Sequence, residues 1–232
     1  MRTVGTHNEA TRKAWLEKVL RSLPAGSRIL DAGAGELHFK QFCSHLQYVS
    51  QDFGQYDGQG DAKGLQTGKW DQSRLDIVCD IVSIPEPDAS FDAILCVEVF
   101  EHLPEPVLAL KEFSRLLKKG GQLVLTAPFC SLTHFAPYHF YTGFNRYFYQ
   151  KHLTELGFSI EELSENGNFF EFVAQELRRV ADVSKRYAND KPSILERAAV
   201  LFVLKMLSRF SRADSGSSEL LHFGFSLKAT KQ

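Results

Sequence analysis

The segment that most limits the fold is a short apolar strand that runs into a glycine-rich turn. Residues 28–36 read Arg-Ile-Leu-Asp-Ala-Gly-Ala-Gly-Glu. Because glycine carries no side chain, a strand followed by Asp-x-Gly-x-Gly lets the backbone approach a ligand closely. A dinucleotide-binding fingerprint requires Gly-x-Gly-x-x-Gly, whereas the third glycine position here is His38. The strand also ends in Asp31, which would repel a pyrophosphate and suits a cationic ligand instead.

The hydrophobic pattern around this segment predicts an α/β fold. Strands alternate with helices as far as residue 126, which is typical of a Rossmann-like doubly wound sheet. The expected strands are 28–31, 48–52, 76–80, 91–98, 122–126, 158–163 and 220–229. The expected helices are 8–22, 37–45, one that begins near Pro104 and Pro106 and is closed by Gly120 and Gly121, 150–156, 169–188 and 194–210. Residues 54–73 show no period and are expected to form a long loop.

We expect one domain over residues 1–232, in four parts. The first is an N-terminal helix within 1–27, and the second is a core over 28–167. A helical insertion follows over 168–212, and residues 213–232 supply the last strand. The apolar run 198–204 in the insertion is flanked by basic residues, which favours a buried or dimer-forming helix over a peripheral membrane contact.

Two further acids follow the next two strands. Asp52 lies 17 residues beyond Gly35 (52 − 35), close to the spacing of about 20 expected of a carboxylate that binds a ribose diol. Asp80 ends the third expected strand, where it would accept a hydrogen bond from the amine of an adenine. Three carboxylates at successive strand ends therefore predict a site for an adenosine that bears a positive group.

Six segments in order resemble a known family, the class I S-adenosylmethionine-dependent methyltransferases of the type-11 domain group. The matching segments are 30–35, 52–53, 80–81, 85–92, 97–103 and 116–121. The resemblance covers about residues 28–165. It implies a seven-stranded sheet with an antiparallel last strand, for which 220–229 is the candidate. The loop 54–73 and the insertion after residue 167 depart from the family's minimal pattern.

The resemblance also implies roles for individual residues toward S-adenosyl-L-methionine. Gly33 and Gly35 would line the methionine part, Asp31 would reach its ammonium, and Asp52 would bind the ribose hydroxyls. Around the adenine and the methyl group it implies Phe53 as a stacking ring, Asp80 on the adenine amine, Ile81 beside it, and Glu98 where cofactor and substrate meet.

Three histidines are candidates for a catalytic base, because the histidine pKa lies near neutrality. His102 follows the fourth strand, and His134 and His139 lie in the aromatic segment 129–149, which should overhang the ligand crevice as a lid. The alternative is that these histidines only pack or bond locally. We expect no metal site, because His134 and His139 are five residues apart with no acid near them in sequence.

Composition narrows the class of partner. The 27 basic and 28 acidic residues give a net charge of −1, so we expect no nucleic-acid partner. The N-terminus lacks the apolar core of a signal peptide, no apolar run is long enough to span a membrane, and no CxxC pair occurs, which together favour a reducing cytoplasm.

The sequence thus predicts a methyltransferase that uses S-adenosyl-L-methionine. The expected acceptor is a hydroxyl or amine of a small molecule, or of a lipid- or sugar-linked one. The alternative is a non-catalytic nucleoside-binding module with the same fold.

Overall fold

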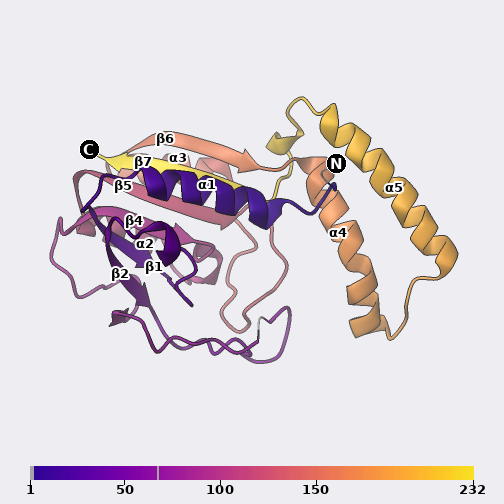
Figure 1. The fold of residues 1–232 in the computed structure, drawn as a ribbon, viewed down its shortest axis with the longest axis horizontal. Coiled ribbons are helices and arrows are strands. Elements are labelled where there is room, and N and C mark those ends of the chain that lie inside the picture. Colours follow the sequence, from indigo (N-terminus) through magenta and orange to yellow (C-terminus); the bar gives the residue numbers. More distant parts are fainter. Residues whose placement is uncertain (1–2, 67) are drawn as a thin grey trace. The chain divides into compact units, whose positions relative to one another are not determined.

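The computed structural model describes residues 3–66 and 68–232, and a seven-stranded sheet is its main feature. The strand order is β3-β2-β1-β4-β5-β7-β6 (Figure 1). The strands are β1 (Arg28–Ala32), β2 (Gln47–Asp52), β3 (Ile77–Val78), β4 (Phe91–Val97), β5 (Leu117–Pro128), β6 (Phe158–Asn166) and β7 (Gly224–Lys231). Neighbours from β3 to β5 pair in parallel, and β7 pairs antiparallel to β5. The predicted Rossmann-like seven-stranded sheet with an antiparallel last strand is confirmed.

Five α-helices accompany the sheet in the described part of the chain. They are α1 (Asn8–Ser22), α2 (Pro106–Leu116), α3 (Arg146–Glu155), α4 (Phe169–Val183) and α5 (Ile194–Arg212). The prediction for α1 was correct at both ends. Pro106 occupies the first turn of α2, where the missing N–H costs no helical hydrogen bond.

The central strand β4 is covered on both faces of the sheet. Ile94 and Cys96 pack into an apolar cluster with α2 and α3, whereas Ala93 and Leu95 pack into a second cluster with α1. Successive side chains of a strand point to opposite faces. The uninterrupted apolar run of β4 is therefore buried from both sides, as expected of a central parallel strand.

The helix predicted over residues 37–45 is wrong. Leu37 has a positive φ of 64°, which ends any helix that the glycine turn could have started. Turns follow instead, with one short 3-10 helix at Lys40–Phe42 (η1). Apolar spacing over this segment reflects burial of Phe42 and Cys43 and not helical periodicity.

Other boundaries moved for identifiable reasons. Gly120 and Gly121 lie inside β5 and do not close α2, which already ends at Leu116. The third strand is only two residues long, so Asp80 follows it at a distance of two residues. Helix α3 begins earlier than predicted because the Asn145 side chain caps it by accepting from two backbone N–H groups.

The chain divides into two compact units. One contains Ala14–Ser164 and Gly224–Gln232, and holds most of the sheet. The other contains Met1–Lys13, as far as it is described, and Glu165–Phe223. The single-domain assignment over residues 1–232 stays a prediction.

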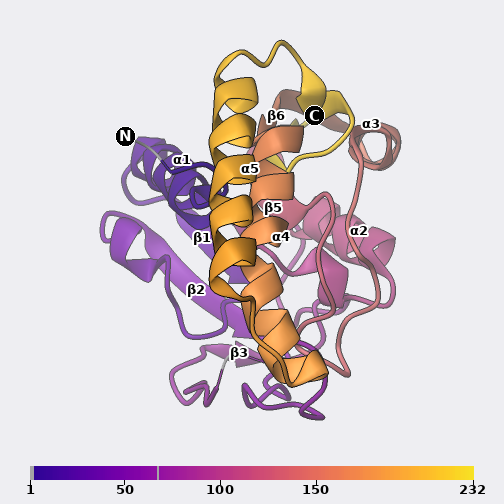
Figure 2. The same ribbon diagram turned by 90° about the vertical axis from the view of Figure 1, so that its right-hand side faces the viewer.

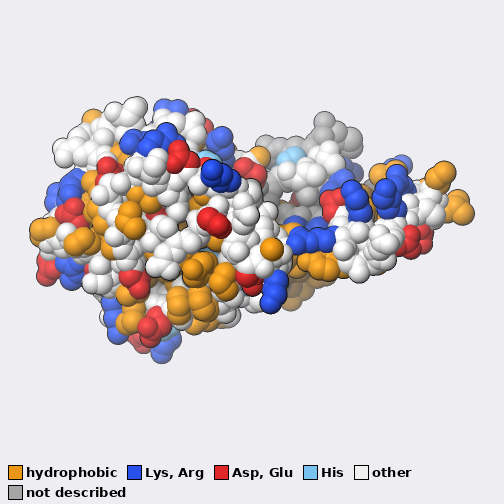
Figure 3. All heavy atoms as spheres, turned by 90° about the horizontal axis from the view of Figure 1, so that it is seen from below, with side chains coloured by type: hydrophobic (Ala, Val, Ile, Leu, Met, Phe, Trp, Pro, Cys, Tyr) orange, Lys and Arg blue, Asp and Glu red, His pale blue; other side chains and the backbone are white. Residues whose placement is uncertain are grey.

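The predicted helical insertion is the main part of the second unit. Its helices α4 and α5 lie side by side (Figure 2) and bury Val4, Ala174, Leu204 and Leu207 between them. Basic and hydrophobic side chains both reach the surface of this helical pair (Figure 3), and Leu201 and Phe202 are exposed in the single chain. No helix among the described residues is long and apolar enough to cross a membrane.

Candidate functional site

The glycine turn lies where the order of the sheet reverses. From β1 the chain passes to β2 on one side, and later to β4 on the other. In open α/β sheets, ligands bind at the carboxyl ends of the strands at such a switch point. The turn after β1, the end of β2 and the end of β4 therefore lie at the edge of the sheet where a ligand is expected.

Both glycines of the turn are required by their surroundings. Gly33 has φ of 79°, and a Cβ there would lie 2.4 Å from the Cγ2 atom of Val99. Gly35 has φ of 50°, and a Cβ there would lie 3.1 Å from the Trp70 ring. The helix expected to follow the turn is absent from the described structure, so helix N–H groups do not line it. The turn can therefore contribute to ligand binding only by letting the ligand come close to its backbone.

Asp52 ties the end of β2 to this turn. Its Oδ2 atom accepts from the Gly35 N–H at 3.0 Å, and its Oδ1 atom accepts from the Gly54 N–H at 3.0 Å and from the Gln72 Nε2 at 3.2 Å. The carboxylate is buried. Because an ionised carboxylate has about four acceptor positions, replacement of the Gln72 amide by a ligand hydroxyl would keep Asp52 satisfied.

Asp31 is buried at the end of β1 beside Asp52. Burial raises the pKa of Asp31 to about 7, the Tyr48 hydroxyl opposes this by donating a hydrogen bond, and the Asp52 charge adds to the rise. A cation placed beside Asp31 would offset both unfavourable effects. A ligand with a positive group at this site stays a prediction from the sequence.

The remaining predicted cofactor residues lie around this centre with unequal burial. Asp80 is exposed and accepts from the Val82 N–H at 3.1 Å, so it acts as a local cap in this structure. Ile81 belongs to the main apolar core. The Phe53 ring meets the Tyr138 ring edge-on, with centroids 5.0 Å apart.

Glu98 directly follows β4 with a strained backbone. Its φ is 53°, and its Oε1 atom accepts from the Thr126 hydroxyl at 2.8 Å. A positive φ at a residue other than glycine is uncommon and concentrates at functional sites. This conformation fixes the side chain at the carboxyl end of β4.

The three candidate histidines lie in one cluster. Ring centroids are 4.7 Å apart for His102 and His134, 4.9 Å for His134 and His139, and 6.0 Å for His102 and His139. His102 ends the short 3-10 helix Phe100–His102 (η2), whereas the other two come from the lid. The fold thus brings together residues that are more than 30 positions apart.

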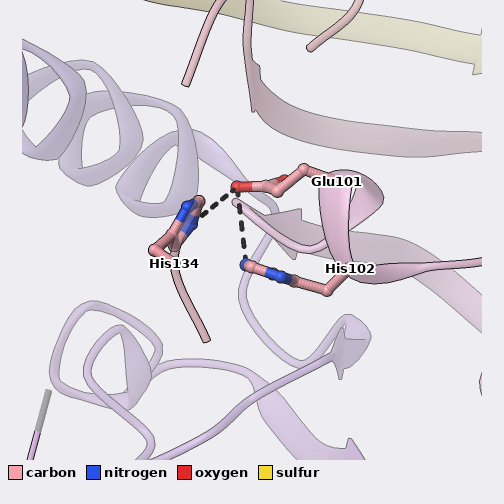
Figure 4. Close-up of side chains that lie close together, drawn as sticks. All are labelled: Glu101, His102 and His134. Atoms are coloured by element: carbon pink, nitrogen blue, oxygen red, sulfur yellow. Dashed lines mark ion pairs between the residues drawn. The ribbon is translucent and has the colours of Figure 1, made fainter. Parts of the chain in front are cut away.

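Glu101 is a fourth member that sequence reasoning did not single out. Its side chain is 1% exposed, and its Oε1 atom lies 3.7 Å from the Nε2 atoms of His102 and His134 (Figure 4). No acid lies near His134 in sequence, but the fold brings the Glu101 carboxylate beside it. The signal was present in the pair Glu-His at 101–102, but its partner in the lid was invisible without the fold.

The electrostatics of this cluster differ from one histidine to the next. Burial and the neighbouring His134 lower the pKa of His102 to about 3. Burial also disfavours charged His134, but the Glu101 carboxylate outweighs it and raises the His134 pKa. Burial and His134 lower the pKa of His139, which keeps that imidazole neutral at pH 7.

An aromatic contact joins the histidine cluster to the glycine turn. The Phe135 ring stacks on His102 at 4.8 Å and on Tyr56 at 4.7 Å, and it meets Trp70 edge-on at 5.3 Å. Leu65 of the loop 54–73 exchanges backbone hydrogen bonds with the lid, through Thr133 and Phe135. The loop 54–73 and the segment 129–149 are therefore joined to one another next to the histidine cluster and the glycine turn.

Comparison with known proteins first confirms the fold. A SAM-dependent methyltransferase from Archaeoglobus fulgidus superposes with a TM-score of 0.58 at 15% identity, over 96% of this chain and 94% of that one. The cyclase SpnF superposes with a TM-score of 0.57 at 20% identity, over 96% and 81% of the two chains. At these identities the likeness concerns the fold alone, and the cyclase shows that the fold by itself does not fix the reaction.

The sequence comparison is more specific. Residues 30–125 match the family described as "Methyltransferase domain". A ubiquinone biosynthesis O-methyltransferase from Xanthomonas oryzae pv. oryzae is 32% identical over 105 residues, which are 44% of this chain and 43% of that protein. The matched region thus spans less than half the length of these curated relatives.

The sheet order, the antiparallel β7 and the glycine turn at the switch point define the class I methyltransferase fold. Residues 30–125 match the methyltransferase domain family that the sequence resembles.

Proposed function

We propose that this protein binds S-adenosyl-L-methionine at the turn after β1 and transfers its methyl group to a hydroxyl of a small acceptor. The observation that carries the proposal is the junction of Asp31, the Gly33–Gly35 turn and Asp52 at the switch point of the sheet. Asp31 would face the ammonium, and the turn would lie along the methionine part. Asp52 would accept from the ribose hydroxyls once Gln72 gives way.

Phe53, Asp80, Ile81 and Glu98 complete the proposed cofactor site. Phe53 would lie against the adenine, and Asp80 would exchange the Val82 N–H for the adenine amine. Glu98, which the backbone holds at the end of β4, would mark the boundary between cofactor and acceptor.

The acceptor would enter beneath the lid, next to the histidine cluster. When its oxygen attacks the methyl carbon, the bond from carbon to sulfur breaks, and the sulfur keeps the electron pair. The hydroxyl proton would pass to His139, whose lowered pKa leaves a neutral imidazole to accept it. His102 and His134 would support this proton acceptor through the contacts within the cluster.

A hydroxyl acceptor is favoured over an amine by two observations. A base is useful for a hydroxyl, and three histidines gather where the acceptor would lie. In addition, the relative from Xanthomonas oryzae is named as an O-methyltransferase. The aromatic lid suits a planar or apolar acceptor, including a lipid-linked one, and a sugar-linked hydroxyl is the alternative.

The test is calorimetric titration with S-adenosyl-L-methionine and its demethylated product, S-adenosyl-L-homocysteine. We expect both to bind with micromolar dissociation constants. Asp52→Asn keeps the size of the side chain but removes its charge, and should weaken binding on the order of 10- to 100-fold. As a matched control, Asp57→Asn changes an exposed aspartate in the same loop and should leave affinity unchanged. Absence of heat with both ligands would overturn the proposal.

A further inference from the structure

Glu101 and His102 hold buried acceptor atoms that nothing in the described structure satisfies. The Oε2 atom of Glu101 and the Nε2 atom of His102 have no hydrogen-bond partner among residues 3–66 and 68–232. A buried polar atom without a partner destabilises the fold, and more so when it is charged. Such atoms therefore call for a ligand, and Figure 4 shows the Glu101 carboxylate directed between the two imidazole rings.

The backbone fixes which nitrogen of each histidine faces Glu101. The Nδ1 atom of His102 lies 2.5 Å from the Tyr138 carbonyl oxygen, and that of His134 lies 2.8 Å from the Leu132 carbonyl oxygen. A carbonyl only accepts, so each Nδ1 carries the hydrogen and donates it. In the neutral rings each Nε2 then presents a lone pair toward Glu101. This carbonyl contact on the far nitrogen is the usual support of a metal-binding histidine.

The distances within the cluster fit a shared cation better than direct hydrogen bonds. Both separations from Nε2 to Oε1 are 3.7 Å, whereas a hydrogen bond between nitrogen and oxygen measures about 2.7–3.2 Å. Ligands held at about 2.0 Å from a tetrahedral zinc ion lie about 3.3 Å from one another. The ligand atoms of Glu101, His102 and His134 all fall within 4.8 Å of one another. A small inward shift would close them around one ion.

We propose that Glu101, His102 and His134 form a binding site for a divalent transition-metal ion of the zinc class. Two imidazoles and one carboxylate are a known ligand set for catalytic zinc, which leaves a fourth position open. The neighbouring Glu98 carboxylate adds negative charge that favours a cation, since it acts electrostatically on both Glu101 and His134. This proposal differs from the sequence-based expectation of no metal.

The open position gives the ion a role that rests on the proposed function. An oxygen of the acceptor would bind there, and the ion would lower the pKa of that hydroxyl. His139 would take the released proton, and the oxygen would remain on the ion while it attacks the methyl carbon. Because a phenol loses its proton more readily than an alkyl hydroxyl, the acceptor class becomes a phenol.

The experiment uses the untagged full chain, stripped of metal with a chelator and titrated with Co²⁺ as a spectroscopic probe. We expect one equivalent to bind with the visible absorption bands of a tetrahedral cobalt site, and Zn²⁺ to displace it. His134→Ala removes a ligand and should weaken binding by more than about 100-fold, since loss of outer-shell support alone costs 10- to 100-fold. Glu101→Gln, which keeps the shape of the buried side chain, should weaken it in the same direction.

His38→Ala is the matched control. His38 also lies beside a carboxylate, with its Nε2 atom 3.9 Å from Glu36, but it is exposed and outside the cluster. Its removal should leave cobalt binding unchanged, and circular dichroism should show that every variant is folded. A spectrum without tetrahedral bands, or one that persists in His134→Ala, would overturn the metal site and leave a proton shared by Glu101 and His134.

Failure of the metal site can be told apart from failure of the proposed function. Calorimetry with S-adenosyl-L-homocysteine on the metal-free protein reports on the glycine turn alone. If the nucleoside binds but no cobalt site is found, the metal site is overturned and the proposed methyltransferase function stands. If cobalt binds but the nucleoside does not, the proposed function is overturned and the metal site stands.

Discussion

The glycine turn and the histidine cluster are built in opposite ways, although one aromatic contact joins them. The turn is a product of backbone: Gly33 and Gly35 are two residues apart, and their N–H groups are held by the Gln51 carbonyl and the Asp52 carboxylate. The cluster is a product of side chains, because Glu101 and His134 come from separate segments. A substitution that adds atoms to the glycine turn should therefore weaken cofactor binding. In the histidine cluster, a substitution that changes the functional group should matter more than one that changes only the shape of the side chain.

The largest effect should come from adding one carbon to the turn. We expect Gly33→Ala to weaken S-adenosyl-L-homocysteine on the order of 100-fold, because the new Cβ would collide with Val99 and strain the positive φ. Gly26→Ala is the control: its φ of 81° is nearly the same, but nothing lies within 4 Å of the added carbon. Calorimetry on both variants separates the collision from the strain. Equal affinities for the two variants would show that closeness of the turn to Val99 is irrelevant.

A chemical change in the cluster should affect turnover and not cofactor binding. His139→Ala should lower kcat on the order of 100-fold, which is the usual contribution of a general base, while the dissociation constant of the cofactor stays the same. Rates measured with labelled S-adenosyl-L-methionine and a phenolic acceptor check this, with His38→Ala as the unaffected control. If kcat falls equally in both variants, His139 is not the proton acceptor.

A smaller effect concerns protons at the turn. In the free protein the raised pKa of Asp31, about 7, means that the side chain is protonated at pH 6. An ammonium beside it favours the ionised form, so cofactor binding at pH 6 should release nearly one proton, and at pH 8.5 almost none. Calorimetry in two buffers of different ionisation enthalpy measures this release. Asp31→Asn should abolish it, and a release that persists in that variant would assign the proton to another group.

The same raised pKa sets the sign of a stability change. Between pH 4 and pH 7 the folded protein keeps a proton on Asp31 that the unfolded chain gives up, so the free energy of unfolding should fall as pH rises through this range. Above pH 7 the stability that the bound proton of Asp31 contributes is lost. Urea unfolding of the cofactor-free protein at pH 5 and pH 8, compared with Asp31→Asn, isolates this slope from other groups.

Much of the fold could be predicted from the sequence because its signals are local. The apolar run of β4 and the Asp-x-Gly-x-Gly turn each depend on a few consecutive residues. The helix over 37–45 failed because Leu37 adopts a left-handed backbone conformation that apolar spacing does not reveal. The insertion over 168–212 was recognised as helical, but its assembly with residues near the N-terminus into a separate unit required long-range contacts.

The candidate site also has one part that depends on local sequence and one part that depends on long-range contacts. Asp31, Asp52 and the two glycines could be located by spacing along consecutive strands. Glu101 could not, because its significance comes from the position of His134 in the lid, and no sequence spacing encodes that approach. A site formed by the backbone can therefore be predicted from the sequence, whereas a cluster of side chains from separate segments can be identified only in the structure.

The most direct test of the central claim is a crystal structure of the protein with S-adenosyl-L-homocysteine. The account predicts the ribose hydroxyls within hydrogen-bond distance of Asp52, with the Gln72 amide displaced, and the amino group beside Asp31. A nucleoside bound elsewhere, with Gln72 still donating to Asp52, would contradict it.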